Sequence, residues 1–354
     1  MTNTAHKGRG AVSQTRHRFE KTSTVLSPEE RAADDRAPPT ELRPLRSASI
    51  ISHNSSPDIP FDHSINPYQG CEHGCVYCYA RPTHSYFDLS PGLDFETQVF
   101  YKPQARATLL AEWEKPGYRC EPICIGANTD PYQPAEKKLQ ITRGLLETFL
   151  EHRHPVSIIS KGTLMLRDID LLEALAERKL CSVAISIPTA ENALKRLLEP
   201  RVPAASARFD MISALRARNI PVSLMLAPVI PAVNDAEIES IVSRAALAGV
   251  DHASYILLRL PHELKQVFRE WLDNHIPERA GHVMSLVRQA SGGRDYDNRF
   301  GVRQTGRGPY ARMIRDRFRV ACKKNGLSSG RQRIALDSSQ FRRPGPQQMG
   351  LDFN

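Results

Sequence analysis

Three cysteines, Cys71, Cys75 and Cys78, form a C-x3-C-x2-C motif in this chain. Gly70 and Gly74 stand within the same stretch, and glycine lets a backbone turn where a Cβ atom would clash. Thiolates that converge on one point bind soft metals, either zinc or an iron–sulfur cluster. Because this loop supplies three ligands, a fourth metal position stays open to a substrate or cofactor. The spacing therefore predicts a metal centre with one open position.

Two other interpretations of the loop stay open. A structural zinc site could take His73 as its fourth ligand, although such sites usually draw their ligands from two separated pairs. No second C-x2-C or H-x3-H follows at a suitable distance. Three free thiols in a core would need apolar neighbours, whereas Gln, Glu, His and Gly surround these cysteines. We favour the iron–sulfur cluster.

The wider run NPYQGCEHGCVYCYAR, with the aromatic Tyr77 directly before the third cysteine, resembles the radical S-adenosylmethionine (SAM) superfamily. Within it, the run is similar to the spore photoproduct lyase-like branch, also called DNA repair photolyase-like proteins. The resemblance covers roughly residues 60–290 and is most specific at the cysteine loop. It implies a [4Fe–4S] cluster on the three cysteines, with SAM chelated at the open iron. Reductive cleavage of SAM would then yield a 5′-deoxyadenosyl radical, with flavodoxin or ferredoxin as the electron donor.

Short apolar segments alternate with amphipathic ones after the cysteine loop. The predicted strands are 122–126, 156–160, 182–187, 222–227 and 253–258, and the predicted helices between them are 142–152, 168–178, 204–218 and 236–248. This alternation is typical of a parallel sheet covered by helices. One strand before the cysteines would make six βα units. The fold class is therefore α/β, and the resemblance implies a partial (β/α)6, TIM-like barrel.

Polar residues follow several of these strands, and in parallel barrels the reactive groups lie at the carboxyl ends of strands. The resemblance implies SAM contacts for residues at or after the ends of the predicted strands 122–126, 156–160 and 182–187. These residues are Asn128, Thr129, Asp130, Lys161 and Ser186. It further implies that Arg208, on the next helix, reaches the SAM carboxylate. Ordinary turn chemistry, solvated strand ends and a surface arginine are the alternatives.

Two tyrosines, Tyr77 and Tyr79, flank the third cysteine. In spore photoproduct lyases, tyrosines at these positions relay a hydrogen atom, and a cysteine beyond strand two is the first donor. This chain has no cysteine there, and we interpret Cys120 and Cys124 as core thiols. The departure argues against cleavage of thymine dimers.

Charge is unevenly distributed along the chain. The formal net charge is +9, yet residues 299–343 hold thirteen Lys or Arg against Asp316 and Asp337. A basic region on a near-neutral body suggests a polyanionic partner, usually nucleic acid. We divide the chain into a disordered leader (1–45), a barrel (46–298) and a basic C-terminal extension (299–354). On a helix predicted over 309–325, four cations share one face: Arg312, Arg315, Arg319 and Lys323. Met313, Arg317 and Val320 lie on another side, which is predicted to dock on the rest of the protein.

The remaining composition restricts the setting of the protein. No run approaches the ~18 apolar residues of a transmembrane helix, and the N-terminus has no apolar signal region. Seven cysteines, an odd number, argue against a disulfide framework and favour a reducing cytoplasm. The oligomeric state is not predicted. Three functions stay open: a radical SAM enzyme acting on nucleic acid, one acting on a small molecule or protein, and a non-catalytic, metal-stabilised nucleic-acid-binding module.

Overall fold

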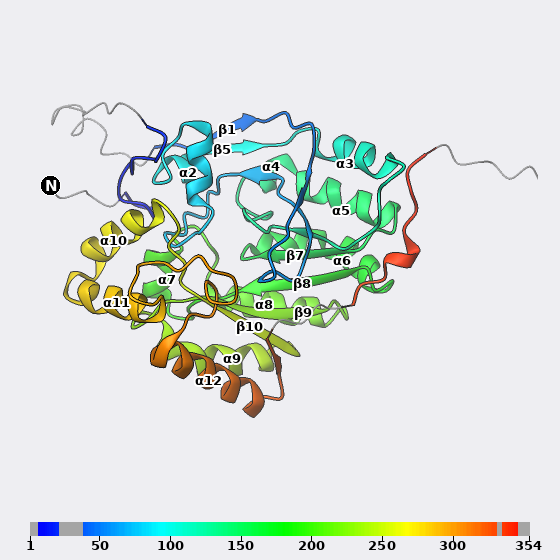
Figure 1. Ribbon diagram of the computed structural model, residues 1–354. Helices are drawn as coiled ribbons and strands as arrows, with labels where there is room; N and C mark the ends of the chain where they lie inside the picture. Colours follow the sequence, from blue (N-terminus) through cyan, green and yellow to red (C-terminus); the bar gives the residue numbers. More distant parts are fainter. Residues whose placement is uncertain (1–5, 21–37, 331–334, 346–354) are drawn as a thin grey trace, which may run out of the picture.

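A mostly parallel eight-stranded sheet forms the centre of the molecule (Figure 1). The computed structural model describes residues 6–20, 38–330 and 335–345. The strands run in the order β11-β10-β9-β8-β7-β6-β3-β2, and β2 alone is antiparallel to its neighbour. Their bounds are β2 Ile51–His53, β3 His63–Ile65, β6 Ile123–Ile125, β7 Val156–Ser160, β8 Cys181–Ser186, β9 Val222–Val229, β10 His252–Leu257 and β11 Ser328–Ser329.

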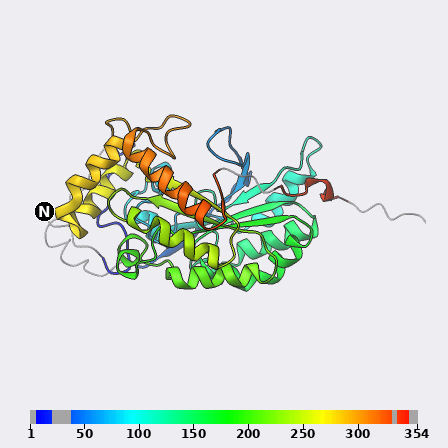
Figure 2. The same ribbon diagram turned by 90° about the horizontal axis from the view of Figure 1, so that it is seen from below.

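Helices follow the parallel strands and cover one face of the sheet (Figure 2). They are α3 Ala105–Glu114, α5 Ile141–Glu151, α6 Ile169–Ala176, α8 Ala205–Arg216 and α9 Ile238–Leu247. Alternate strand residues such as Ile123, Val156 and Val183 point into a core shared with Leu145 and Leu172. Burying such side chains contributes roughly 1.5–3 kcal/mol each. In the described residues no helix is long and apolar enough to cross a bilayer.

The five strands predicted from the alternating pattern are confirmed as β6, β7, β8, β9 and β10, as are the helices between them, and β3 is the one strand expected before the cysteines. In the described part of the chain the sheet is open, with β2 and β11 at its two edges. A short helix that the sequence did not predict, α7 Asn192–Leu198, follows β8. A second, three-stranded sheet has the order β1-β5-β4, with bounds β1 Glu41–Pro44, β5 Gln98–Tyr101 and β4 Tyr68–Gln69. The cysteine loop follows β4 and precedes a 3-10 helix at Arg81–Phe87.

Part of the predicted disordered leader is ordered. The backbone amides of Gly10 and Ala11 donate to the buried carboxylate of Glu96, with Gly10 N 3.0 Å from Oε2 and Ala11 N 2.8 Å from Oε1. A Cβ atom on Gly10 would lie 1.8 Å from the carbonyl oxygen of Gly74, so the segment runs directly against the cysteine loop. The prediction is wrong for residues 6–20 and for the stretch that contains β1. Residues 1–5 and 21–37 lie outside the described residues.

The C-terminal extension is also part of the folded body. Helices α10 Leu264–His275, α11 Pro277–Ala290 and α12 Gly308–Lys324 form a further layer, in which α12 lies beside α9 in both views (Figures 1 and 2). The buried face of α12 is Ala311, Ile314, Phe318, Ala321 and Cys322. Met313 and Val320 are 41% and 46% exposed, so the predicted docking side is wrong. The predicted basic face is exposed along its whole length.

Candidate cluster and cofactor site

The cysteine loop is held by buried polar contacts to its backbone. Arg81, which is fully buried, donates from Nε to the carbonyl oxygen of Cys75 at 2.9 Å and from Nη2 to that of Gly74 at 3.2 Å. Its charge is balanced by Glu96, 2.5 Å away. Gly74 has a φ of 68°, a left-handed conformation that favours glycine. These contacts hold the backbone of the loop from its interior side. The cysteine side chains are therefore not needed to hold the loop in place.

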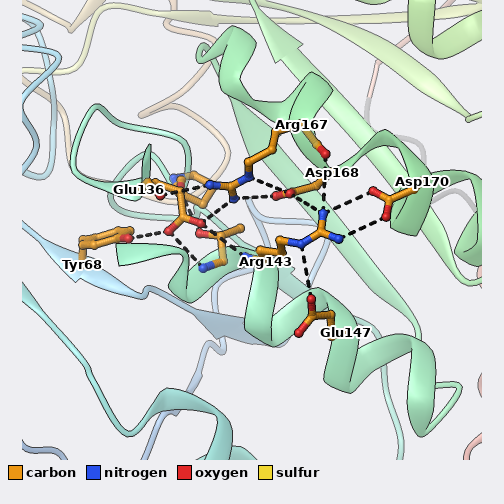
Figure 3. Close-up of polar contacts among 9 residues, drawn as sticks. Tyr68, Glu136, Arg143, Glu147, Arg167, Asp168 and Asp170 are labelled. Carbon is orange, nitrogen blue, oxygen red and sulfur yellow. Dashed lines mark hydrogen bonds and ion pairs between the residues drawn. The ribbon is translucent and has the colours of Figure 1, made fainter. Parts of the chain in front are cut away.

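A second support ties the cysteine loop to the loop after β6. The buried side chain of Gln133 accepts from Glu72 N at 2.9 Å and donates to the carbonyl oxygen of Gly70 at 3.2 Å. The loop after β6 is itself held by Glu136, which receives the Tyr68 hydroxyl and lies 2.8 Å from Arg167 Nη2 (Figure 3). The two loops consequently form one rigid unit.

The three cysteines lie at one end of a cavity of about 1100 Å³. Most predicted site residues line the same cavity, although they come from four separate parts of the chain: Tyr77, Tyr79, Asn128, Thr129, Asp130, Lys161 and Ser186. All seven parallel strands of the described sheet contribute residues to its lining. The rule that reactive groups gather at the carboxyl ends of strands therefore placed these residues together correctly.

Burial raises the pKa of all three cysteine thiols, Cys71, Cys75 and Cys78. An uncompensated thiolate is disfavoured in such surroundings, whereas a bound metal centre offsets that cost and deprotonates its ligands. Within the described residues, no three His, Cys, Asp or Glu side chains are close enough to hold a single metal ion. His73 lies 3.4 Å from Asp130 through Nδ1 and so faces a carboxylate. Three thiols without a fourth protein ligand fit a cluster that keeps one open position.

Asp130 organises the cluster end of the cavity. Its two carboxylate oxygens accept from Ser160 Oγ at 2.7 Å and from Lys161 N at 2.8 Å. Burial alone would raise the pKa of this carboxyl, but the charge of His73 and these hydrogen bonds lower it to about 2. Asp130 is thus an anion that links the cysteine loop, the loop after β6 and the end of β7.

Glu199 is a central residue that the sequence did not reveal. It follows α7, is fully buried, and accepts from the hydroxyl of Tyr77 and from Arg208 Nη2, the latter at 2.8 Å. Its Oε1 atom lies 3.8 Å from Lys161 Nζ. Burial opposes ionisation, yet Arg208 and then Lys161 keep the pKa of Glu199 below its ordinary value. A single glutamate after an unpredicted helix carries no motif that could have identified it.

Lys161 and Ser186, each predicted to contact SAM, lie in contact with each other. Lys161 Nζ donates to Ser186 Oγ at 2.5 Å, and that hydroxyl donates to the carbonyl oxygen of Ala227 at 3.0 Å. The ammonium group also lies 5.8 Å from the ring centroid of Tyr77. A cation and a hydroxyl therefore stand side by side on the cavity wall, which suits a carboxylate ligand.

Arg208 does not line the cavity, and this corrects the prediction that it contacts SAM. Its side chain is fully buried, with Nη1 donating to the carbonyl oxygen of Ser186 at 2.8 Å and Nη2 paired with Glu199. Its role is to position residues that do face the cavity. The resemblance identified an arginine near the site but not the carboxylate that neutralises it.

The two tyrosines have different surroundings. The hydroxyl of Tyr77 donates to Glu199, and burial raises the pKa of Tyr77. Tyr79 is 42% exposed, and its hydroxyl donates to the carbonyl oxygen of Ala127. Arg259, which follows β10, holds its guanidinium 4.8 Å from the Tyr79 ring centroid. The strand-end rule, applied to the sixth strand, would have found Arg259.

Cys124 is buried, as predicted for a core thiol, but it also lines the cavity, from the middle of β6. Burial raises the pKa of Cys124 to about 12, so the thiol is neutral at physiological pH. Cys120 does not line the cavity.

Comparison with known proteins places this site in a family. Residues 65–245 match the family described as the Radical SAM superfamily. An uncharacterized protein of Mycobacterium tuberculosis is 36% identical over 233 residues, which cover 65% of this chain and 68% of the relative. An uncharacterized protein of Methanocaldococcus jannaschii is 27% identical over 215 residues, covering 60% and 76%.

Solved structures share the fold. Spore photoproduct lyase complexed with dinucleoside spore photoproduct aligns with a TM-score of 0.59 at 13% identity, covering 81% of each chain. A mutant of that lyase with bound AdoMet and the same compound also gives 0.59 at 13% identity, covering 81% of this chain and 80% of the lyase. At this identity the likeness concerns the fold alone. The chain belongs to the radical SAM superfamily, whose members use a [4Fe–4S] cluster and S-adenosylmethionine as cofactors.

Proposed function

We propose that this protein is an enzyme that cleaves SAM reductively and uses the resulting radical on a nucleic-acid substrate in the reducing cytoplasm. Cys71, Cys75 and Cys78 would hold the cluster, and Lys161 with Ser186 would hold the carboxylate of SAM. When bound, these cofactors supply a 5′-deoxyadenosyl radical that abstracts a hydrogen atom. An electron carrier such as flavodoxin or ferredoxin would reduce the cluster. The open sheet would correspond to the partial (β/α)6 barrel expected for the family.

The observation that carries this proposal is the convergence of three otherwise unused thiols with the Lys161–Ser186 pair in one cavity. The chain's own residues would position the cofactors and exclude water from them. Asn128, Thr129 and Asp130 form the adjoining wall, and we assign them to the methionine part of SAM. Tyr77 and Tyr79 lie beside the cluster end, where a hydrogen-atom relay would require them.

Two observations support a nucleic-acid substrate. The exposed basic face of α12 adjoins the cavity, because Arg315 and Arg319 belong to both. A row of cations on a docked helix can neutralise several phosphates and release their counterions. The similar lyase structures hold a dinucleoside compound, which is consistent with a nucleoside-type substrate here.

A small-molecule substrate is the second candidate, and a specific observation favours it. Phe300, Arg303 and Phe318 from the C-terminal extension line the cavity, so this extension is a wall of the site. A walled cavity is the usual form of a small-molecule site. A duplex could not enter such a space without releasing a base from its stack.

The decisive experiment is anaerobic reconstitution with iron and sulfide, reduction with dithionite, and assay for 5′-deoxyadenosine with SAM present. We expect a brown, oxygen-sensitive protein that forms 5′-deoxyadenosine. A reconstituted protein that binds SAM but never cleaves it would contradict the proposal. Titration of labelled single- and double-stranded DNA at several salt concentrations then separates the nucleic-acid substrate from a small molecule, since phosphate contacts produce a steep salt dependence.

A further inference from the structure

Two of the arginines that line the cavity have no carboxylate partner. Arg303 is paired with Asp58 at 2.7 Å, and Arg319 lies 3.4 Å from Asp316. In contrast, no Asp or Glu within the described residues forms an ion pair with Arg259 or Arg315. Arg315 is exposed and can be solvated, whereas Arg259 is half-buried, so an anion from outside the chain would compensate the charge of Arg259 in particular.

Arg259 is positioned to bind an oxyanion. Its guanidinium lies over the ring of Tyr79, 4.8 Å from the centroid, a cation–π contact that does not use its N–H donors. Its protein contact is long, with Nη2 3.4 Å from the hydroxyl of Tyr296, and its buried Nε has no hydrogen-bond partner. A guanidinium with an unpartnered Nε and only one long contact has donors left for the two-oxygen edge of a phosphate.

The rest of this wall offers groups that suit a nucleoside. The rings of Tyr79 and Phe300 are 42% and 58% exposed beside the cavity and provide flat faces on which a base can stack. The buried hydroxyl of Tyr255, which also lines the cavity, has no hydrogen-bond partner among the described residues. Together, the aromatic faces, the free hydroxyl and the unpaired cations are groups that would bind the base, the sugar and the phosphate of a phosphorylated nucleoside.

The inner face of the sheet leaves room for such a ligand. Bulky side chains fill the interior of a typical parallel barrel, but the cavity here is lined by the small hydroxyl side chains of Ser64, Ser157, Ser182, Ser223 and Ser254. The first three share one register across the sheet, with Cys124 between Ser64 and Ser157. The resulting volume of about 1100 Å³ slightly exceeds the roughly 300–1,000 Å³ of ligand pockets. It leaves space for a substrate beside SAM.

We propose that this cavity binds one phosphorylated nucleoside, either a free nucleotide or a nucleotide within a strand, and that Arg259 binds its phosphate. The inference rests on the proposed function, because it assigns the substrate of the same site. SAM also carries an anionic group, but its carboxylate has a separate cation and hydroxyl in Lys161 and Ser186. Arg259 is therefore assigned to the substrate.

The test measures binding of thymidine, thymidine 5′-monophosphate and SAM to the reconstituted full-length protein by equilibrium dialysis. Wild-type protein is expected to prefer the monophosphate to thymidine by about tenfold or more, the effect of one charge-assisted contact. Arg259→Gln should abolish that preference and leave SAM affinity unchanged, and Arg259→Lys should retain part of it. Arg244→Gln is the matched control, because Arg244 also lies over an aromatic ring, 4.3 Å from the centroid of Phe209, but does not line the cavity.

Three results would overturn the assignment: no preference for the monophosphate in wild-type protein, an unchanged preference in Arg259→Gln, or an equal loss of SAM binding in that variant. The third would show that Arg259 binds the SAM carboxylate. Iron content and circular dichroism establish that each variant is folded. A short single-stranded oligonucleotide, titrated in parallel, shows whether the nucleotide is free or within a strand. Formation of 5′-deoxyadenosine is assayed separately, with and without the nucleotide, because its absence in both assays would contradict the radical chemistry and leave the phosphate preference intact.

Discussion

The two sides of the cavity treat their charges differently. On the cluster side, Lys161 and Arg208 share the buried carboxylate of Glu199, and Asp130 accepts from the neighbouring backbone and a serine. On the wall to which β10 and α12 contribute, neither Arg259, which lies against Tyr79, nor the exposed Arg315 forms an ion pair with an Asp or Glu of the described residues. Charged side chains that form ion pairs within the protein are held in a fixed geometry, whereas a charged side chain without such a partner can bind a ligand of opposite charge. This contrast is consistent with the proposals that the first set of residues holds the cofactors and that Arg259 binds an anionic group of the substrate.

The largest expected effect concerns the cluster ligands. Cys75→Ala should lose the bound cluster almost completely, because a cluster held by three thiolates is left with two. Bound iron and sulfide and the absorbance near 400 nm measure this. Cys120→Ala, at a cysteine outside the cavity, is the control and should keep the cluster. Wild-type iron content in Cys75→Ala would refute the assignment.

The second prediction removes the ion pair between Arg208 and Glu199 beside the cluster. Arg208→Met leaves the fully buried Glu199 without its closest cation, and removal of one partner of a buried pair typically costs about 3–5 kcal/mol. Denaturant unfolding gives the free energy. The control is Arg218→Met, whose pair with Glu173 is also 2.8 Å long but is 55% and 32% exposed, where such pairs contribute about 0–1 kcal/mol. Equal losses in both variants would show that burial does not distinguish the two pairs.

Lys161 tests whether the balanced charges also serve a cofactor. Lys161→Ala should weaken SAM binding by about 1.5–3 kcal/mol, the contribution of a hydrogen bond to a charged group. Equilibrium dialysis with labelled SAM and the reconstituted protein measures the affinity. Lys138→Ala, an exposed lysine that does not line the cavity, should bind SAM like the wild type. If Lys161→Ala does so too, this side has a structural role only.

The smallest expected effect concerns the cations on the exposed face of α12 and their contribution to nucleic-acid binding. Each of Arg312→Gln and Lys323→Gln, on the exposed face of α12, should lower the slope of log affinity against log salt for DNA by about one phosphate contact. Substitution is preferable to truncation at Arg299, because the extension is a wall of the cavity and part of the core. A slope that neither variant changes would separate α12 from nucleic-acid binding.

Local patterns were sufficient to predict much of this molecule. Helices such as α8 and α12 were located to within a few residues, because their boundaries follow from the spacing of apolar residues along the chain. The predicted docking face of α12 is nevertheless offset by one to two positions from the face that is buried in the structure. Met313 and Val320 are apolar, but which apolar residues are buried depends on the neighbouring α9 and α11, which the spacing alone does not describe.

The amino-acid sequence by itself determined the cysteine motif, the alternation of strands and helices, and the polar strand ends that include Lys161 and Ser186. These features are local, so a few neighbouring residues suffice to specify them. Only the tertiary structure decided that Arg208 is neutralised, that Arg259 lies over Tyr79, and that the segment containing Gly10 packs against the cysteine loop. The physical reason is that the cost of a buried charge depends on which partners folding brings within a few ångströms. Those partners are often distant in the chain, as Arg259 is from Tyr79.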